Sequence, residues 1–190
     1  MASIQTRPSE LALPVRTLKA LRDALAAEVG EDGAARALRI AGAAAGEAMF
    51  RTFASTLDAN GEENEIRAAL STVPEDRFWG AVSAFFASRG WGRLSFMAVH
   101  EGVGALEAPD WIEANSESVS ARPACFFTTG LLAGLLGRIT GDEIAVLEVE
   151  CRSRGDARCR FLFGAPAALE ALYANIATGH DVDASLAALA

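Results

Sequence analysis

The sequence predicts an α+β fold in which N-terminal helices pack on an antiparallel sheet, with one long helix inserted between its strands. Apolar residues recur with helical spacing as far as Ser88, and short strand-like segments follow Gly90. The chain has 190 residues, of which 51% are hydrophobic, so a single globular domain with a substantial core is expected.

Two helices are predicted before the first polar turn. Apolar residues at i, i+3 and i+4 indicate a helix over 14–29, which Gly30 ends. A second helix is expected over 32–57. Its centre, 41–48 (AGAAAGEA), contains two glycines, and each costs a helix roughly 1 kcal/mol relative to alanine. Another element is therefore expected to pack closely against this stretch.

Two shorter helices complete the first half. A polar turn at 60–64 leads into a short helix over 66–70, and a longer helix is expected over 74–88. Pro74 suits the first helical turn, and the two acidic residues after it lie near the positive end of the helix dipole.

Four strands are predicted in the second half. Residues 92–101 and 104–108 form one expected hairpin. Residues 143–152 and 157–163 form another, joined by a turn at Gly155 and Asp156.

One buried helix is predicted between the two hairpins, over 122–138, and a closing helix over 166–178. Residues 111–120 have no clear periodicity. The expected organisation is an N-terminal arm over 1–13, one domain over 14–178 and a tail over 179–190 that is either a short helix or disordered.

Composition excludes several classes of protein. The net charge of −8 argues against direct nucleic-acid binding. The polar N-terminus lacks the apolar segment of a secretory signal, and no apolar run approaches the ~20 residues of a membrane span. A cytoplasmic protein with reduced thiols is expected. Sixteen arginines against one lysine, together with abundant alanine, indicate a bacterial source with a GC-rich genome.

The three cysteines and one carboxylate, Cys125, Glu148, Cys151 and Cys159, form the most informative pattern. A hairpin would bring the last two cysteines together, and a helix start near the first favours its thiolate. Three thiolates and one carboxylate complete a tetrahedral shell for Zn²⁺, with no position left for water, so such a site is structural.

Two alternatives stay open on spacing alone. The three cysteines could be ordinary buried residues, and Glu150 could replace Glu148 as the fourth ligand. Bound zinc would leave a net charge of −2, which nearby arginines could offset. These arginines are Arg122, Arg152, Arg154, Arg158 and Arg160.

The stretch Pro123–Phe161 (PACFFTTGLLAGLLGRITGDEIAVLEVECRSRGDARCRF) resembles the 4-vinyl reductase domain, also called the hydrocarbon-binding domain. That family shares a C…G…aG…E-x2-C-x3-G-x3-C-x-F signature, and the resemblance extends over about 89–164. Sensor domains of phenol- and toluene-responsive activators are similar. The resemblance implies zinc on the four residues in this order, and it selects Glu148 over Glu150.

The resemblance also implies a fold and an assembly. The wider superfamily includes small subunits of the TRAPP complex and heme–nitric-oxide-binding domains. By this similarity, the chain is expected to form a TRAPP-like α+β ligand-binding domain, to associate as a homodimer, and to hold an apolar small molecule between its helices and sheet.

Candidate residues for that pocket are mostly aromatic. They are Trp79, Phe86, Trp91, Phe96, His100, Trp111 and Phe126. Each aromatic could equally be a core residue. His100, on a predicted strand, is a candidate polar contact, although a structural strand histidine is the alternative. A buried tryptophan needs an acceptor for its indole N–H.

The predicted function is non-catalytic binding, transport or sensing of a hydrophobic small molecule, aromatic or tetrapyrrole. The chain has neither a G-x-G-x-x-G dinucleotide motif nor an evident Ser-His-Asp arrangement, and zinc would use all three cysteines. One alternative is an accessory protein of (bacterio)chlorophyll synthesis linked to 4-vinyl reduction. Another is a heme-based gas sensor with His100 as the axial ligand.

Overall fold

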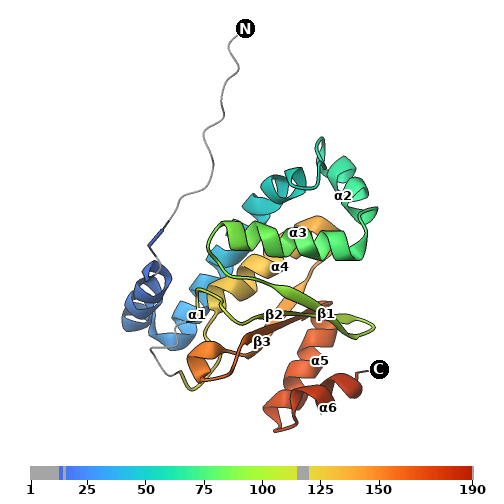
Figure 1. Cartoon of the computed structure of the whole chain (residues 1–190). Helices are drawn as coiled ribbons and strands as arrows, with labels where there is room; N and C mark the ends of the chain where they lie inside the picture. The colour runs from blue at the N-terminus through green and yellow to red at the C-terminus, as the bar shows by residue number, and fades with distance from the viewer. Residues whose placement is uncertain (1–12, 15, 115–119, 190) are drawn as a thin grey trace.

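A four-stranded antiparallel sheet lies at the centre of the molecule (Figure 1). The computed structural model describes residues 13–14, 16–114 and 120–189. The sheet order is β1-β2-β4-β3. The strands are β1 (Ser95–His100), β2 (Val103–Ala108), β3 (Ala145–Glu150) and β4 (Cys159–Gly164). Both predicted hairpins and the α+β class are therefore confirmed.

Alternation along the strands separates two hydrophobic clusters, one on each face of the sheet. In β4, Phe161 joins the larger cluster with the long helices α1 (Thr17–Ser55) and α4 (Phe126–Thr140). Leu162 joins the smaller cluster with α5 (Pro166–Ala177) and α6 (Val182–Ala187). The inserted helix and the closing helix are both present. Of the two alternatives for the tail, the structure has the short helix.

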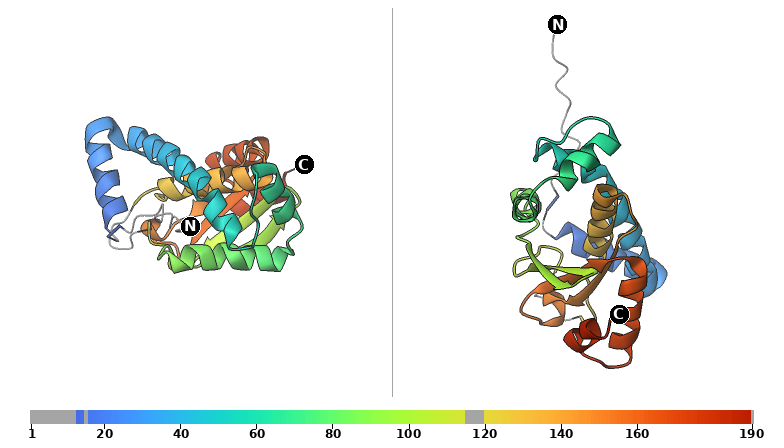
Figure 2. Two further views of the ribbon diagram at one scale, coloured as in Figure 1. Left: turned by 90° about the horizontal axis from the view of Figure 1, so that it is seen from above. Right: turned by 90° about the vertical axis from the view of Figure 1, so that its right-hand side faces the viewer.

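Helix α1 bends at Gly30, whose φ of 76° and ψ of 166° are not helical. Its first part, 17–29, therefore leaves the direction of its second part, as Figure 2 shows in blue. The predicted end of the first helix at Gly30 is confirmed. The predicted arm over 1–13 lies almost entirely outside the described residues, as does the central part of 111–120.

The second part of α1 crosses α4 with the two backbones in contact. A Cβ atom on Gly42 would lie 2.1 Å from the carbonyl oxygen of Phe127, and one on Gly130 would lie 2.0 Å from the carbonyl oxygen of Arg39. The same conflict recurs one turn further along, at Gly46. The close packing predicted for the small-residue stretch is confirmed, and its partner is α4.

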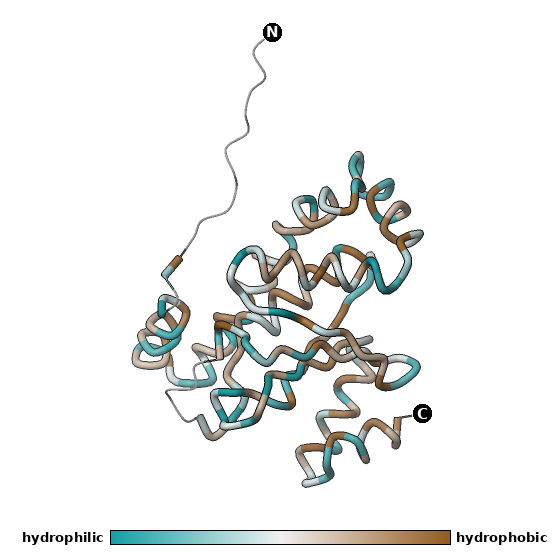
Figure 3. Tube along the Cα trace, viewed as in Figure 1, coloured by the Kyte–Doolittle hydropathy of each residue, from teal (hydrophilic) through white to brown (hydrophobic). Residues whose placement is uncertain are grey.

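Two short helices precede the sheet, and α3 lies beside edge strand β1 (Figures 1 and 2). These helices are α2 (Glu63–Ser71) and α3 (Glu75–Ser88). Helix α2 begins earlier than predicted because Glu62 and Glu65 form a capping box. The turns before α2 and between β1 and β2 are hydrophilic (Figure 3).

Helix α4 begins at Phe126 rather than at residue 122, where the sequence predicted its start. Pro123 disfavours a helical conformation in the residue before it, and Cys125, with φ of −84° and ψ of 58°, is the N-cap. Among the described residues, no helix combines the length and apolarity needed to cross a membrane.

Candidate metal centre

Three elements bring the four predicted ligands together. Cys125 caps α4, Glu148 lies in β3, Cys151 follows that strand, and Cys159 begins β4. One candidate ligand atom from each residue lies within 4.8 Å of the others. The three cysteines are fully buried and Glu148 is 7% exposed.

The spacing of the thiols matches a tetrahedral metal. The Cys125 Sγ lies 3.9 Å from the Sγ atoms of both Cys151 and Cys159. Sulfur atoms each about 2.3 Å from a tetrahedral Zn²⁺ would be about 3.8 Å apart. A disulfide requires about 2.05 Å, and all three cysteines are free.

The Glu148 carboxylate also suits a metal. Its Oε2 accepts a hydrogen bond from the Cys125 backbone N–H at 2.8 Å. Its Oε1 is buried and has no hydrogen-bond partner in the described part of the chain. An unpaired buried acceptor is costly, and a cation among the thiols would satisfy it.

A β-bulge explains why Glu148, and not Glu150, lies beside the thiols. Residues two apart in a regular strand share a face, but the β3–β4 register shifts between these two glutamates. Glu148 is paired with Phe161 and faces the larger cluster, whereas Glu150 is paired with Arg160. Glu150 forms ion pairs with Arg158 and Arg160.

Burial prevents these acidic groups from all carrying charge without a cation. Desolvation, together with the Cys151 charge, raises the pKa of Glu148 to about 9. Burial likewise raises the pKa of Cys125 well above its usual value. Hydrogen bonds from the other two thiols lower the pKa of Cys151. The cluster can therefore hold one thiolate, and a divalent cation would have to displace the remaining protons.

Ion pairs of the neighbouring arginines are formed with other carboxylates. Arg122 pairs with Asp32 at 3.3 Å, and Arg154 pairs with Asp156 at 2.7 Å. The second pair supports the cluster indirectly, because Asp156 also accepts the Cys151 backbone N–H at 2.7 Å. The predicted role of the arginines as charge partners of the ligands is thus replaced by a role in the surrounding structure.

A buried polar relay adjoins the first turn of α4. The indole of Trp111 donates to the Thr128 hydroxyl, which donates to Glu113. Glu113 also accepts the backbone N–H groups of Phe127 and Thr128, at 2.9 and 2.7 Å. Desolvation raises the pKa of Glu113 to about 7. The need of Trp111 for an acceptor signalled part of this relay, but nothing in the sequence marked Glu113.

The predicted pocket residues fall into separate regions. Trp79 and Phe96 stack with ring centroids 4.3 Å apart and an interplanar angle of 8°. Both line a cavity of about 410 Å³ between α3 and β1. Its lining also includes the unpredicted residues Glu75 and Asp76, as well as Ser83.

The remaining candidates lie elsewhere. Phe86 and Trp91 contact Trp111, with ring centroids 5.6 and 5.8 Å away, inside the larger cluster. His100 lines a second cavity, on the opposite face of the sheet. Phe126 lies under the Arg39 guanidinium, 5.1 Å from its carbon. The structure therefore brings together Trp79 with Phe96, and Phe86 with Trp91 and Trp111, but not all seven residues.

Comparison with known proteins concerns the same part of the chain. Residues 110–165 match the family model of the 4-vinyl reductase domain. The matched segment includes all four residues of the cluster, and it confirms the resemblance predicted from Pro123–Phe161.

Solved structures extend the likeness beyond the matched segment. The phenol-responsive sensory domain of the transcription activator PoxR, solved with phenol, is similar with a TM-score of 0.63 and 18% identity. The match covers 90% of this chain and 84% of that one, and it shows a shared fold. A vinyl-4-reductase family protein from Methanocaldococcus jannaschii matches more weakly, with a TM-score of 0.40 and 20% identity over 59% of this chain and 73% of that one. Among curated proteins, none matches the sequence.

Proposed function

We propose that this chain is a non-catalytic, zinc-containing domain that binds a hydrophobic small molecule, as a sensor or carrier. One observation carries the proposal: the 4-vinyl reductase match lies within a fold shared over 90% of the chain with a domain that responds to phenol in PoxR. A small aromatic or hydrocarbon ligand is the corresponding class.

Zinc is proposed as a structural ion on Cys125, Glu148, Cys151 and Cys159. Support comes from the 3.9 Å sulfur separations, from the unpaired Glu148 Oε1 and from the complete burial of the thiols. Four protein ligands leave no coordination position for water, so the ion would hold α4 against the β3–β4 hairpin without taking part in catalysis.

The ligand is proposed to occupy the cavity between α3 and β1. About 410 Å³ is within the range of small-molecule sites, and the stacked Trp79 and Phe96 provide an apolar wall beside the hydroxyl of Ser83. A flat aromatic compound would bury its faces against such a wall, and a nearby hydroxyl could orient a polar substituent.

A fluorescence titration with phenol, toluene and naphthalene tests this proposal. The Trp79→Leu variant should lose binding, whereas Tyr173→Leu, which removes an exposed aromatic from α5, should bind as the wild type does. Failure of all three compounds to bind would overturn the proposed function. Unchanged binding to Trp79→Leu would overturn the location. A Soret band in the purified protein would instead favour the tetrapyrrole or heme alternatives.

A homodimer and a cytoplasmic location complete the proposal. Leu21 and Val29 in the first part of α1 are 44% and 58% exposed, and a second copy would bury them. Three reduced thiols suit the cytoplasm. In analytical ultracentrifugation, the wild type should sediment as a dimer and Leu21→Glu as a monomer. A monomeric wild type would contradict the predicted dimer.

A further inference from the structure

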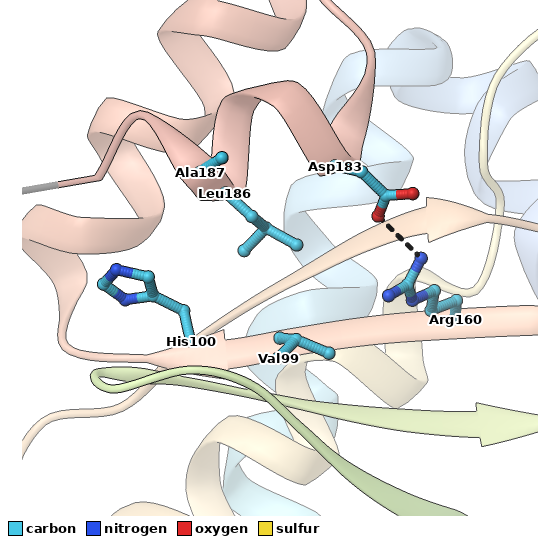
Figure 4. A pocket seen from close by; sticks show the side chains of 6 residues that line it. All are labelled: Val99, His100, Arg160, Asp183, Leu186 and Ala187. Carbon is cyan, nitrogen blue, oxygen red and sulfur yellow. Dashed lines mark ion pairs between the residues drawn. The ribbon is translucent and has the colours of Figure 1, made fainter.

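A second cavity, of about 260 Å³, lies on the face of the sheet opposite the metal centre. Its walls come from β1, β4 and α6. His100 and Arg160 stand at opposite ends of it, with Val99 and Leu186 between them (Figure 4). One end is therefore cationic and the middle is apolar.

Arg160 is an unusual residue to find at a cavity wall. Its side chain is only 11% exposed, and its Nε is buried without a hydrogen-bond partner in the described part of the chain. Its nitrogens approach Glu107, Glu150 and Asp183, but at 3.4, 3.6 and 3.7 Å respectively. These separations are ion pairs without the short, aligned contacts that a guanidinium makes with a well-placed carboxylate.

The local charge count leaves room for one exchangeable anion. Arg158 shares both glutamates with Arg160, at 3.3 Å from Glu107 and 3.2 Å from Glu150, so two arginines balance two glutamates. Asp183 is the fifth charged group. It is 84% exposed and makes the longest of the contacts to Arg160. An exposed pair of this kind contributes little, and a ligand carboxylate could replace it.

His100 presents a hydrogen-bond donor to the same space. Its Nδ1 accepts the Gly102 backbone N–H at 3.3 Å, so a neutral ring carries its proton on Nε2. A carboxylate held by Arg160 would leave its apolar part against Val99 and Leu186, with the histidine donor at the far end.

We propose that this cavity binds a small organic carboxylate with a short apolar or aromatic body, which displaces Asp183 from Arg160. The site is separate from the cavity of Trp79 and Phe96, and its existence does not depend on the function proposed there. Its volume limits the ligand to about the size of benzoate, because specific sites for larger molecules occupy roughly 300 to 1,000 Å³.

Titration of the full chain with benzoate, followed by ¹H–¹⁵N NMR, tests the proposal. Benzoate should shift the backbone signals of Val99, Leu186 and Ala187, and the uncharged analogue benzamide should not. Asp183→Asn removes the competing carboxylate at an exposed position. It should tighten benzoate binding by about two- to fivefold, the size of an exposed ion pair. Glu170→Gln removes an equal charge from α5 and should leave the affinity unchanged.

Arg160→Lys provides the complementary test. Lysine keeps the positive charge but lacks the planar fork that holds a carboxylate through two hydrogen bonds, so benzoate affinity should fall by about tenfold. Equal shifts with benzamide, an affinity unchanged in Asp183→Asn, or shifts confined to residues of the α3–β1 cavity would each overturn the proposal.

Discussion

The indole N–H of Trp111 donates a 2.7 Å hydrogen bond to the hydroxyl of Thr128, in the first turn of α4. The tryptophan is fully buried, so this bond satisfies a donor that has no access to water. Because the same hydroxyl donates to Glu113 at 2.5 Å, one threonine connects the segment after β2 to the helix that carries Cys125.

Thr128→Val should break this relay. The variant leaves the indole N–H unpaired and removes one donor from Glu113, at a cost of about 1–3 kcal/mol in unfolding free energy. Urea denaturation followed by tryptophan fluorescence measures the change. Thr129→Val is the matched control, because that hydroxyl bonds only a carbonyl of its own helix, and a loss as large there would contradict the role given to the relay.

Stability should fall as pH rises, through the titration of Glu113. Burial raises its pKa to about 7 from an ordinary 4.5, so the folded state favours the neutral acid. The cost of ionisation is absent below pH 4.5, grows between the two values and is complete above about 7. It amounts to about 3 kcal/mol.

Glu113→Gln should remove this dependence. Unfolding free energies of the variant and the wild type, measured in urea at intervals from pH 4.5 to 8, should converge at acid pH and separate as the pH rises. Parallel curves over that range would show that Glu113 is ionised in both states and would contradict the shift in its pKa.

The metal centre predicts different outcomes for two neighbouring glutamates. Glu148→Gln removes the carboxylate beside the thiols and should lower the zinc content well below one ion per chain, whereas Glu150→Gln should retain it. Elemental analysis after gel filtration measures the content. Three freely titrating thiols and no zinc in the wild type would reject the metal.

Removal of a thiol should also destabilise the fold. Cys151→Ala should lose several kcal/mol, because binding of a structural ion contributes directly to folding. A chelator should lower the melting temperature of the wild type and leave that of Cys151→Ala unchanged. Equal melting temperatures of the two proteins without chelator would favour three ordinary buried cysteines.

The contact between α1 and α4 predicts opposite effects of alanine at different glycines. Gly42→Ala would place a methyl group 2.1 Å from a backbone oxygen of α4, so the helices must separate, at a cost of about 1–3 kcal/mol or more. Gly80→Ala has nothing within 4 Å of the new Cβ and should stabilise α3 by about 0.5–1 kcal/mol. Thermal unfolding of both variants measures the difference.

Local signals predicted much of this fold. Gly30 ends one helix, Pro166 starts another, and small residues mark the crossing of α1 with α4, because each feature is governed by backbone sterics within a few residues. The start of α4 was placed four residues early because the apolar pattern extends beyond its cap at Cys125.

Features that depend on distant parts of the chain could not be predicted from residue patterns alone. The choice between Glu148 and Glu150 depends on a bulge in the β3–β4 ladder, for which a period of two in the sequence gives no sign. The long, poorly aligned ion pairs of Arg160 likewise arise from strand pairing and from the docking of α6.

Complete burial of the thiols has a kinetic consequence. A chelator in solution cannot reach an ion surrounded by Cys125, Cys151 and Cys159 until α4 moves away from the β3–β4 hairpin. At high chelator concentration, the rate of zinc loss would therefore become independent of that concentration and equal the rate at which this part of the molecule opens. The ion would then serve as a clock for a local motion that equilibrium stability does not measure.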